Sequence, residues 1–141
     1  MTDSTAAQPL ACSSAYVVLA SQAFEPLVAF YQAFLGQDPH PHWPQRYAEF
    51  TWGGLRLGIF SPQASHAAEF QTHQAGAMSL CLEVADLDRA IAHLTRLGYP
   101  PPGPILTASH GREIYAYDPD GNRLILHQSP ATVGSPAESE D

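Results

Sequence analysis

The side chains best suited to chemistry in this sequence are a carboxylate and an imidazole, those of Glu83 and His127. Each alternates with apolar neighbours in a strand-like segment, so both are expected to point to the polar side of a sheet. A histidine paired with a carboxylate can transfer a proton near neutral pH. Glu83 and His127 are therefore the candidate catalytic pair, and a contact at the rim of a binding site without catalysis is the alternative.

Other reactive arrangements are weaker. His40 and His42 are two residues apart, and they can serve a metal only if a third ligand comes from elsewhere. We favour surface histidines there. Ser79 and the segment 109–111 do not form a Gly-x-Ser-x-Gly elbow, and nothing places an acid beside them, so nucleophilic catalysis is disfavoured.

Aromatic residues form a second candidate set, because flat rings bind planar or apolar ligands with little loss of entropy. Trp52 lies beside two glycines at a predicted hairpin tip, and Trp43 precedes a proline, so neither is easily explained as core. Packing in the core is the alternative for the remaining aromatic residues. The set comprises Tyr16, Trp43, Tyr47, Phe50, Trp52, Phe60, Tyr115 and Tyr117.

Composition narrows the possible partners. The chain has 141 residues, 45% of them hydrophobic, which suffices for one core. A net charge of −8 with six Lys and Arg disfavours nucleic acid and anionic membranes. No long apolar segment or signal-like N-terminus occurs, so a cytoplasmic protein is expected. Cys12 and Cys81 are too far apart for a CxxC site, and Cys81 is expected to be a small buried side chain.

The elements that must position these residues occur twice. A strand over 16–19 precedes an amphipathic helix over 24–35 that Gly36 ends, and a strand over 78–84 precedes a helix over 87–97 with Asp86 as N-cap and Gly98 as stop. A proline-rich linker and two or three strands follow each helix. The clearest of these strands are 47–51 with 55–60, and 113–117 with 123–128. Neither copy can close a core alone, so the two must pack together.

The last two strands flank the sequence Asp-Pro-Asp-Gly-Asn at 118–122. Pro119 presets φ for a turn, Gly121 accepts a positive φ, and the Asp and Asn side chains can cap free amides. This pattern predicts a β-hairpin.

Over residues 16–128 the chain resembles the glyoxalase / bleomycin-resistance / extradiol-dioxygenase group, the vicinal oxygen chelate superfamily. The DPDGN turn, Phe30-Tyr31 followed by Leu35-Gly36, and the V-x-D-L sequence at 84–87 carry the resemblance. It implies an α+β fold in which two tandem βαβββ modules form a cup-shaped, curved mixed sheet with the helices outside. Two departures are Ala23, where Asp is usual, and His110-Gly111, where Trp-Gly is common.

The resemblance also sets domain limits. We expect a flexible N-terminus over 1–13, a single domain over 14–128 and a disordered acidic tail over 129–141. Within the domain, the modules cover about 14–74 and 75–128.

Superfamily enzymes hold a divalent metal with four side chains, usually His, Gln or Glu. Those positions fall here on Tyr16, Gly58, Ser79 and Ile125, none of which is a good ligand. The resemblance therefore implies that the usual metal site is absent, and no metal or other cofactor is expected. A divalent metal held elsewhere is the alternative.

The sequence thus predicts a homodimeric small-molecule-binding protein that takes a partly apolar ligand in an aromatic cup, with sequestration like that of bleomycin-resistance proteins as one form. The alternatives are a lyase, isomerase or dioxygenase that uses a displaced metal or the metal-free Glu83 and His127 pair, and an interaction module whose own side chains fill the cup. The expected ligand-binding residues are Tyr16, Trp43, Trp52, Phe60, Ser79, Cys81, Tyr115, Ile125 and His127.

Overall fold

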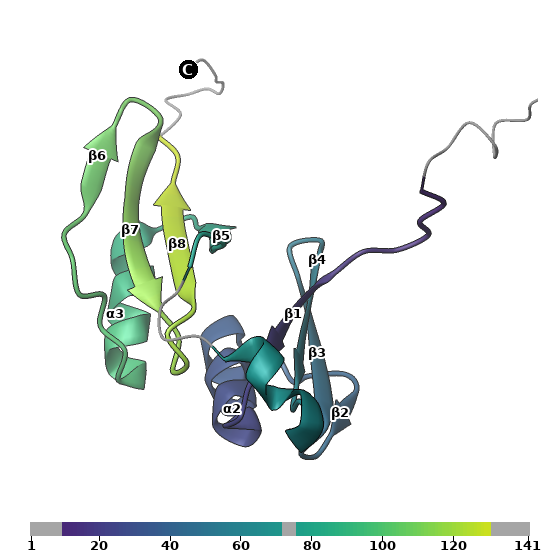
Figure 1. The fold of residues 1–141 in the computed structure, drawn as a ribbon. Helices are drawn as coiled ribbons and strands as arrows, with labels where there is room; N and C mark the ends of the chain where they lie inside the picture. The colour runs from purple at the N-terminus through teal and green to yellow at the C-terminus, as the bar shows by residue number, and fades with distance from the viewer. Residues whose placement is uncertain (1–9, 72–75, 131–141) are drawn as a thin grey trace, which may run out of the picture.

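The chain folds into two modules, each a mixed four-stranded sheet with one α-helix (Figure 1). The computed structural model describes residues 10–71 and 76–130. The first module contains β1 (Val17–Ala20), α2 (Phe24–Leu35), β2 (His42–Trp43), β3 (Tyr47–Trp52), β4 (Leu55–Phe60) and the 3₁₀ helix η1 (Ala64–Phe70). The second contains β5 (Leu80–Glu83), α3 (Leu87–Leu97), β6 (Leu106–Ala108), β7 (Gly111–Tyr117) and β8 (Arg123–Gln128).

The strand orders, β1-β4-β3-β2 and β5-β8-β7-β6, are the same in the two modules. In each, the first strand pairs parallel with the last, and the other pairs are antiparallel. The predicted α+β fold of two βαβββ modules is therefore confirmed. Among the described residues, the strands form two separate sheets, and β1 and β5 are the edge strands nearest the junction of the modules (Figure 1).

Both predicted α-helices have the expected bounds. Gly36 and Gly98 end them in the left-handed conformation, with φ of 69° and 97°. Asp86 caps α3 by accepting a hydrogen bond from the Arg89 amide at 3.0 Å. The strand predicted over 78–84 is shorter than expected, because its ladder with β8 begins at Leu80. The short edge strands β2 and β6 lie in the linkers, and η1 was not predicted.

Side chains alternate across each sheet, and the apolar set packs beneath the helices. In the first module Leu57 and Ile59 are buried on this side, and in the second Leu82, Leu124 and Leu126 are buried. Glu83 and His127 alternate with these leucines and therefore lie on the opposite, polar side of the sheet, as predicted. The remaining core residues are Phe24, Leu27, Val28, Phe30, Tyr31, Leu35, Ala48, Phe50, Leu87, Leu94, Ile114 and Ala116.

A buried hydrogen bond joins the modules. The Tyr31 hydroxyl on α2 donates to Asp118 Oδ2, in the predicted turn between β7 and β8, at 2.6 Å. The Asp118 carboxylate also accepts hydrogen bonds from the Asp120 amide, the Asn122 amide and the Asn122 side chain. Burial and the adjacent carboxylate raise the pKa of Tyr31 well above its ordinary value, so Tyr31 stays a donor. The predicted hairpin is confirmed, and its turn also holds the two modules together.

The helices add a second junction. His93 Nε2 lies 3.1 Å from the Ala33 carbonyl oxygen, and its ring stacks on Phe34. Tyr99 packs edge-on against Phe30. No described helix has the length and apolarity needed to cross a membrane. The predicted flexible N-terminus and acidic tail fall largely on residues 1–9 and 131–141, outside the described part of the chain.

Replacing Tyr31 by Phe removes the hydroxyl and leaves one oxygen of a buried carboxylate with fewer donors. We expect a loss of about 1.5–3 kcal/mol in the free energy of unfolding, measured with urea. Tyr99→Phe is the matched control, because the Tyr99 hydroxyl has no hydrogen-bond partner among the described residues. It should change stability by less than about 0.5 kcal/mol. Equal stability of the two variants would contradict this role of Asp118.

Candidate functional site

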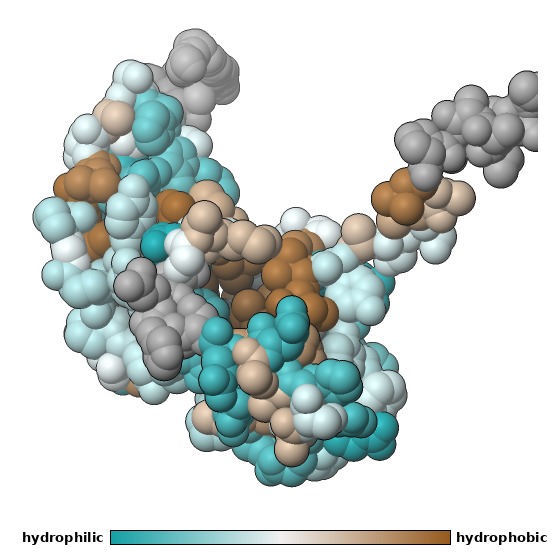
Figure 2. Space-filling view, viewed as in Figure 1, coloured by the Kyte–Doolittle hydropathy of each residue, from teal (hydrophilic) through white to brown (hydrophobic). Residues whose placement is uncertain are grey.

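An apolar cleft lies where the edge strands β1 and β5 approach each other. Figure 2 shows the molecule hollowed between the modules, with hydrophobic residues gathered in the hollow. The cleft has a volume of about 230 Å³. Val18 is 45% exposed and Met78 is 78% exposed. The lining residues are Val17, Val18, Leu19, Tyr31, Leu57, Met78, Ser79, Leu80, Asn122 and Arg123.

Arg123 supplies the positive charge in this cleft. One of its guanidinium nitrogens donates to the Gly76 carbonyl oxygen at 2.8 Å and to Ser79 Oγ at 3.1 Å. The predicted ligand residue Ser79 therefore lies in the cleft, with its hydroxyl already engaged. Arginine has five N–H donors, so others remain for a ligand.

The polar face of the first module is covered by a network centred on Glu49. The Arg56 guanidinium donates to both Glu49 oxygens, at 2.7 and 3.0 Å, and lies 4.3 Å above the ring of Tyr16. The Tyr47 hydroxyl donates to Glu49 at 2.7 Å. Partial burial and this hydrogen bond raise the pKa of Tyr47 to about 12, and the hydrogen bond from Arg56 lowers the pKa of Glu49.

Tyr47 fills the space where a side chain at Gly58 would lie. A Cβ atom built at Gly58 would be 2.7 Å from the Tyr47 hydroxyl, so β4 accepts only glycine there unless Tyr47 moves. Gly58 is one of the four positions on which the resemblance is expected to place the superfamily metal ligands. Of the others, Ser79 accepts a hydrogen bond from Arg123, Tyr16 lies beneath Arg56, and Ile125 has no donor atom. The residues at these four expected positions therefore do not fit a metal.

Glu83 and His127 are in contact on the second module, and their catalytic role stays a prediction. His127 Nδ1 lies 2.7 Å from Glu83 Oε1. The other Glu83 oxygen accepts hydrogen bonds from the Ser129 amide at 2.8 Å and the Ser129 hydroxyl at 2.7 Å. Burial alone would raise the pKa of Glu83, but the hydrogen bonds from Ser129 and His127 outweigh it and lower that pKa. The hydrogen bond to Glu83 raises the pKa of His127.

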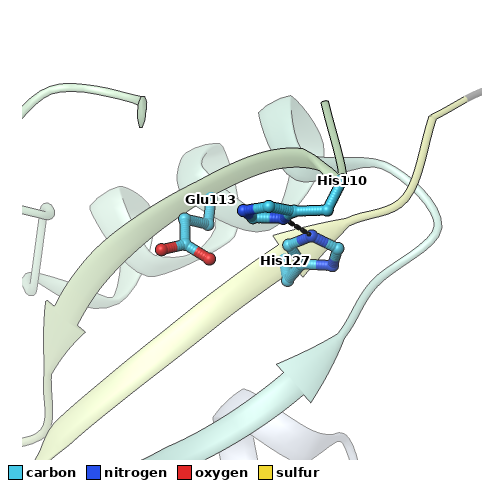
Figure 3. Close-up of side chains that lie close together, drawn as sticks. All are labelled: His110, Glu113 and His127. Atoms are coloured by element: carbon cyan, nitrogen blue, oxygen red, sulfur yellow. Dashed lines mark hydrogen bonds between the residues drawn. The ribbon is translucent and has the colours of Figure 1, made fainter. Parts of the chain in front are cut away.

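His127 also belongs to a cluster with His110 and Glu113 that could hold a metal ion (Figure 3). His110 Nδ1 lies 3.0 Å from His127 Nε2, and one ligand atom from each of the three side chains lies within 4.8 Å of the others. The expectation that the chain has no metal ligands is therefore not supported, although the usual positions do not supply them. Glu113 was not predicted as a ligand, and His110 was noted only within the segment 109–111 and as a departure from the usual Trp-Gly. The predicted hairpin could have indicated Glu113, because folding the chain about residues 118–122 pairs Glu113 with His127.

The other predicted ligand residues are distributed over several surfaces. Cys81, Ile125 and Tyr115 lie side by side on β5, β8 and β7, on the face away from α3. Cys81 is exposed, so its expected burial is wrong: alternation gives the buried side of β5 to Leu82. Partial burial and the nearby Glu113 and Glu83 raise the pKa of the Cys81 thiol.

The predicted ligand residues of the first module make different contacts from one another. Trp43 packs near Tyr47 and is 53% exposed, and Phe60 packs edge-on against Phe70. Trp52 is exposed at the tip of the β3-β4 hairpin, on the same side of β3 as the buried Phe50 and thus away from the polar face. Among the loop histidines, His42 contacts Glu25 at 3.2 Å.

Comparison with known proteins identifies the family of this chain. The chain belongs to the Glyoxalase/Bleomycin resistance protein/Dioxygenase superfamily, whose model matches residues 13–126. No curated protein matches the chain.

Solved structures share the fold. A glyoxalase / bleomycin resistance protein from Catenulispora acidiphila is 23% identical, with a TM-score of 0.61, over 83% of this chain and 98% of the other. The fosfomycin resistance protein FosX from Listeria monocytogenes, solved with Mn(II) and a dihydroxypropylphosphonic acid, is 18% identical, with a TM-score of 0.66, over 82% and 90%. A lactoylglutathione lyase from Agrobacterium tumefaciens is 19% identical, with a TM-score of 0.61, over 84% and 96%.

The Glu83 and His127 pair makes a pH-dependent contribution to stability. In the folded state the pKa of His127 is raised above its ordinary value of 6.5. The contact with Glu83 therefore stabilises the fold fully below pH 6.5, and this stabilisation is lost as the pH rises through the folded-state pKa. In the folded state the pKa of Glu83 is lowered below its ordinary value of 4.5. The hydrogen bonds to its carboxylate therefore stabilise the fold fully above pH 4.5, and this stabilisation is lost as the pH falls through the folded-state pKa. The pair should therefore stabilise the fold most between pH 4.5 and 6.5.

An NMR titration of the histidine ring protons in chelator-treated protein can check this contact. We expect a His127 pKa above 6.5 that falls in Glu83→Gln. Glu69→Gln changes an exposed carboxylate on η1 and should leave the His127 titration unaltered. The same His127 pKa in both variants would show that Glu83 does not hold the ring.

Proposed function

We propose that this protein binds a small, partly apolar molecule in the cleft between its two modules. The observation that carries the proposal is the exposure of apolar side chains in a concave site: Val18 and Met78 are 45% and 78% exposed within the cleft. Exposed apolar surface that is gathered in a hollow marks a binding site more often than scattered apolar residues do. The cleft also argues against the alternative in which the module's own side chains fill the cup.

The polar groups of the cleft suggest the rest of the ligand. Arg123 and Asn122 line the cleft, so an acceptor group such as a carboxylate, sulfonate or carbonyl would be oriented beside them. The volume of about 230 Å³ suits a ligand of one to three rings. Larger ligands would extend over the adjoining face of Cys81, Ile125 and Tyr115. A cationic drug of the bleomycin kind would instead be drawn by the net charge of −8, and sequestration of such a ligand is the second form of the proposal.

A homodimer is part of the proposal. Tyr16 and Tyr115 are 49% and 41% exposed on the polar faces of the two modules, and a second copy could cover them. Multi-angle light scattering should give a mass twice the 15.2 kDa of one chain. A mass of one chain at micromolar concentration would contradict this part and leave the cleft untouched.

Catalysis is the second candidate function, favoured by the 2.7 Å contact between Glu83 and His127. A histidine held by a carboxylate is poised to accept or donate a proton at Nε2. Here Nε2 faces His110, so this candidate requires that His110 gives way to a substrate or shares in the proton transfer. Conversion of a bound ligand that is lost in His127→Ala, with binding retained, would support it.

The cleft can be tested by filling it. Val18→Trp places a large ring among the lining residues and should weaken binding of 1-anilinonaphthalene-8-sulfonate at least tenfold. This probe combines apolar rings with an anionic group for Arg123. Fluorescence titration gives the affinity, and displacement of the probe then screens candidate ligands, bleomycin among them.

Ala92→Trp is the matched control, because it adds the same ring to an exposed position of α3. It should leave the probe affinity unchanged. Light scattering on both variants separates loss of the cleft from loss of a dimer. Equal probe affinity in the two variants, or no saturable binding by the wild-type chain, would contradict the proposed cleft.

A further inference from the structure

We propose that His110, Glu113 and His127 form a binding site for one divalent transition-metal ion, at a place different from that of the superfamily metal. The superfamily positions fall on Tyr16, Gly58, Ser79 and Ile125, and Ile125 precedes His127 by two residues on the same face of β8. The new site is thus displaced along β8, away from the cleft. This inference does not depend on the proposed ligand cleft.

The backbone brings the three donors together from one antiparallel unit. Glu113 on β7 lies directly opposite His127 on β8, and His110 lies in the tight turn between β6 and β7. Directly paired residues on one face have Cβ atoms about 4.5–5.5 Å apart, a separation that one ion can bridge. Two rigid strands and a short turn therefore position all three donors.

Gly111 allows His110 to approach β8. Its φ of 129° favours glycine, and a Cβ there would lie 2.2 Å from the Gln128 carbonyl oxygen and 3.0 Å from His127 Nε2. Any other residue would push the turn away from His127. The glycine thus serves both the backbone bend and the contact of the two imidazoles.

The distances between donors are on the scale of a coordination sphere. His110 Nδ1 and His127 Nε2 are 3.0 Å apart, and the three donors span at most 4.8 Å. Bonds of about 2.0–2.2 Å from zinc to nitrogen and oxygen place neighbouring ligand atoms roughly 3–3.5 Å apart. The imidazoles already meet this spacing, and a rotation of the Glu113 side chain would bring its carboxylate to the same ion (Figure 3).

Glu83 provides the outer support that metal-binding histidines commonly have. It lies 2.7 Å from His127 Nδ1, which assigns the proton to Nδ1 and directs the Nε2 lone pair to the cluster. Glu83 is itself fixed by two hydrogen bonds from Ser129. His127 is therefore oriented before any ion arrives.

The donor set defines the class of ion. Two imidazoles and one carboxylate are ligands of zinc and of iron(II), whereas Mg²⁺ and Ca²⁺ prefer oxygen donors alone. Arg112, which precedes Glu113 in the sequence, contacts Asp88 and Gln128. Glu83 and Glu113 give the cluster negative charge that suits a dication. Because His110 is exposed, positions on the ion stay open to water or a further ligand.

The test uses the full chain without a histidine tag, stripped with a chelator, and titrated with Zn²⁺ by calorimetry and with Co²⁺ by visible absorption. We expect one equivalent of each ion to bind, with a micromolar or lower Kd for Zn²⁺ and a d–d spectrum for Co²⁺. His110→Ala and Glu113→Gln should each raise the Kd at least tenfold. Glu83→Gln should raise it roughly tenfold through the orientation of His127.

His66→Ala is the matched control, because it removes another exposed histidine that lies outside the cluster. It should leave the Kd and the stoichiometry unchanged. Circular dichroism of the metal-free variants checks that each remains folded, which is expected for His110→Ala because that side chain is exposed. Equal affinity of His110→Ala and His66→Ala, or a Kd near millimolar for the wild-type chain, would overturn the proposal.

Discussion

The buried carboxylate of Asp118 is the constraint on which the arrangement of the molecule depends. At 3% exposure it accepts four hydrogen bonds, three from its own turn and one from Tyr31 of the other module. A buried charge is tolerated only when it is fully hydrogen-bonded. The turn and the junction of the modules are therefore one cooperative unit, since loss of the Tyr31 contact leaves the carboxylate less satisfied.

The same turn fixes the register of β8 against β7. From Tyr117 opposite Arg123, the ladder places Tyr115 opposite Ile125 and Glu113 opposite His127. A slip of one residue would turn Arg123, Ile125 and His127 into the core and bring leucines to the surface. The positions of the cleft arginine and of the histidine cluster thus both follow from the geometry of residues 118–122.

Most of the fold could be predicted from the sequence because its signals are local. Glycines at 36 and 98, the Asp86 cap and the DPDGN turn each act within a few residues, and the structure has these boundaries. The edge strands β2 and β6 carry no alternating pattern, being only two and three residues long. The cluster of His110, Glu113 and His127 was missed for a different reason. It depends on His110 in a turn, whose side-chain direction periodicity does not determine.

Two glycines show how one fold acquires different surfaces in its two modules. At Gly58 the missing side chain makes room for Tyr47, whose hydroxyl joins Glu49 and Arg56 in a closed polar network. At Gly111 the missing side chain makes room for His110 to approach His127. The first module therefore presents polar groups joined in a closed network, and the second presents two imidazoles and a carboxylate whose ligand atoms lie within 4.8 Å of one another.

This asymmetry would separate the proposed ligand cleft from the proposed metal site along a single strand. Arg123 lies in the cleft and His127 in the cluster, four residues apart on one face of β8, which is about 13 Å for an extended strand. A ligand confined to the cleft would not reach an ion at His127. A ligand that also covers Ile125 and Tyr115 would reach it. Ligand length therefore determines whether the cleft and the cluster act as independent sites or as two ends of one site.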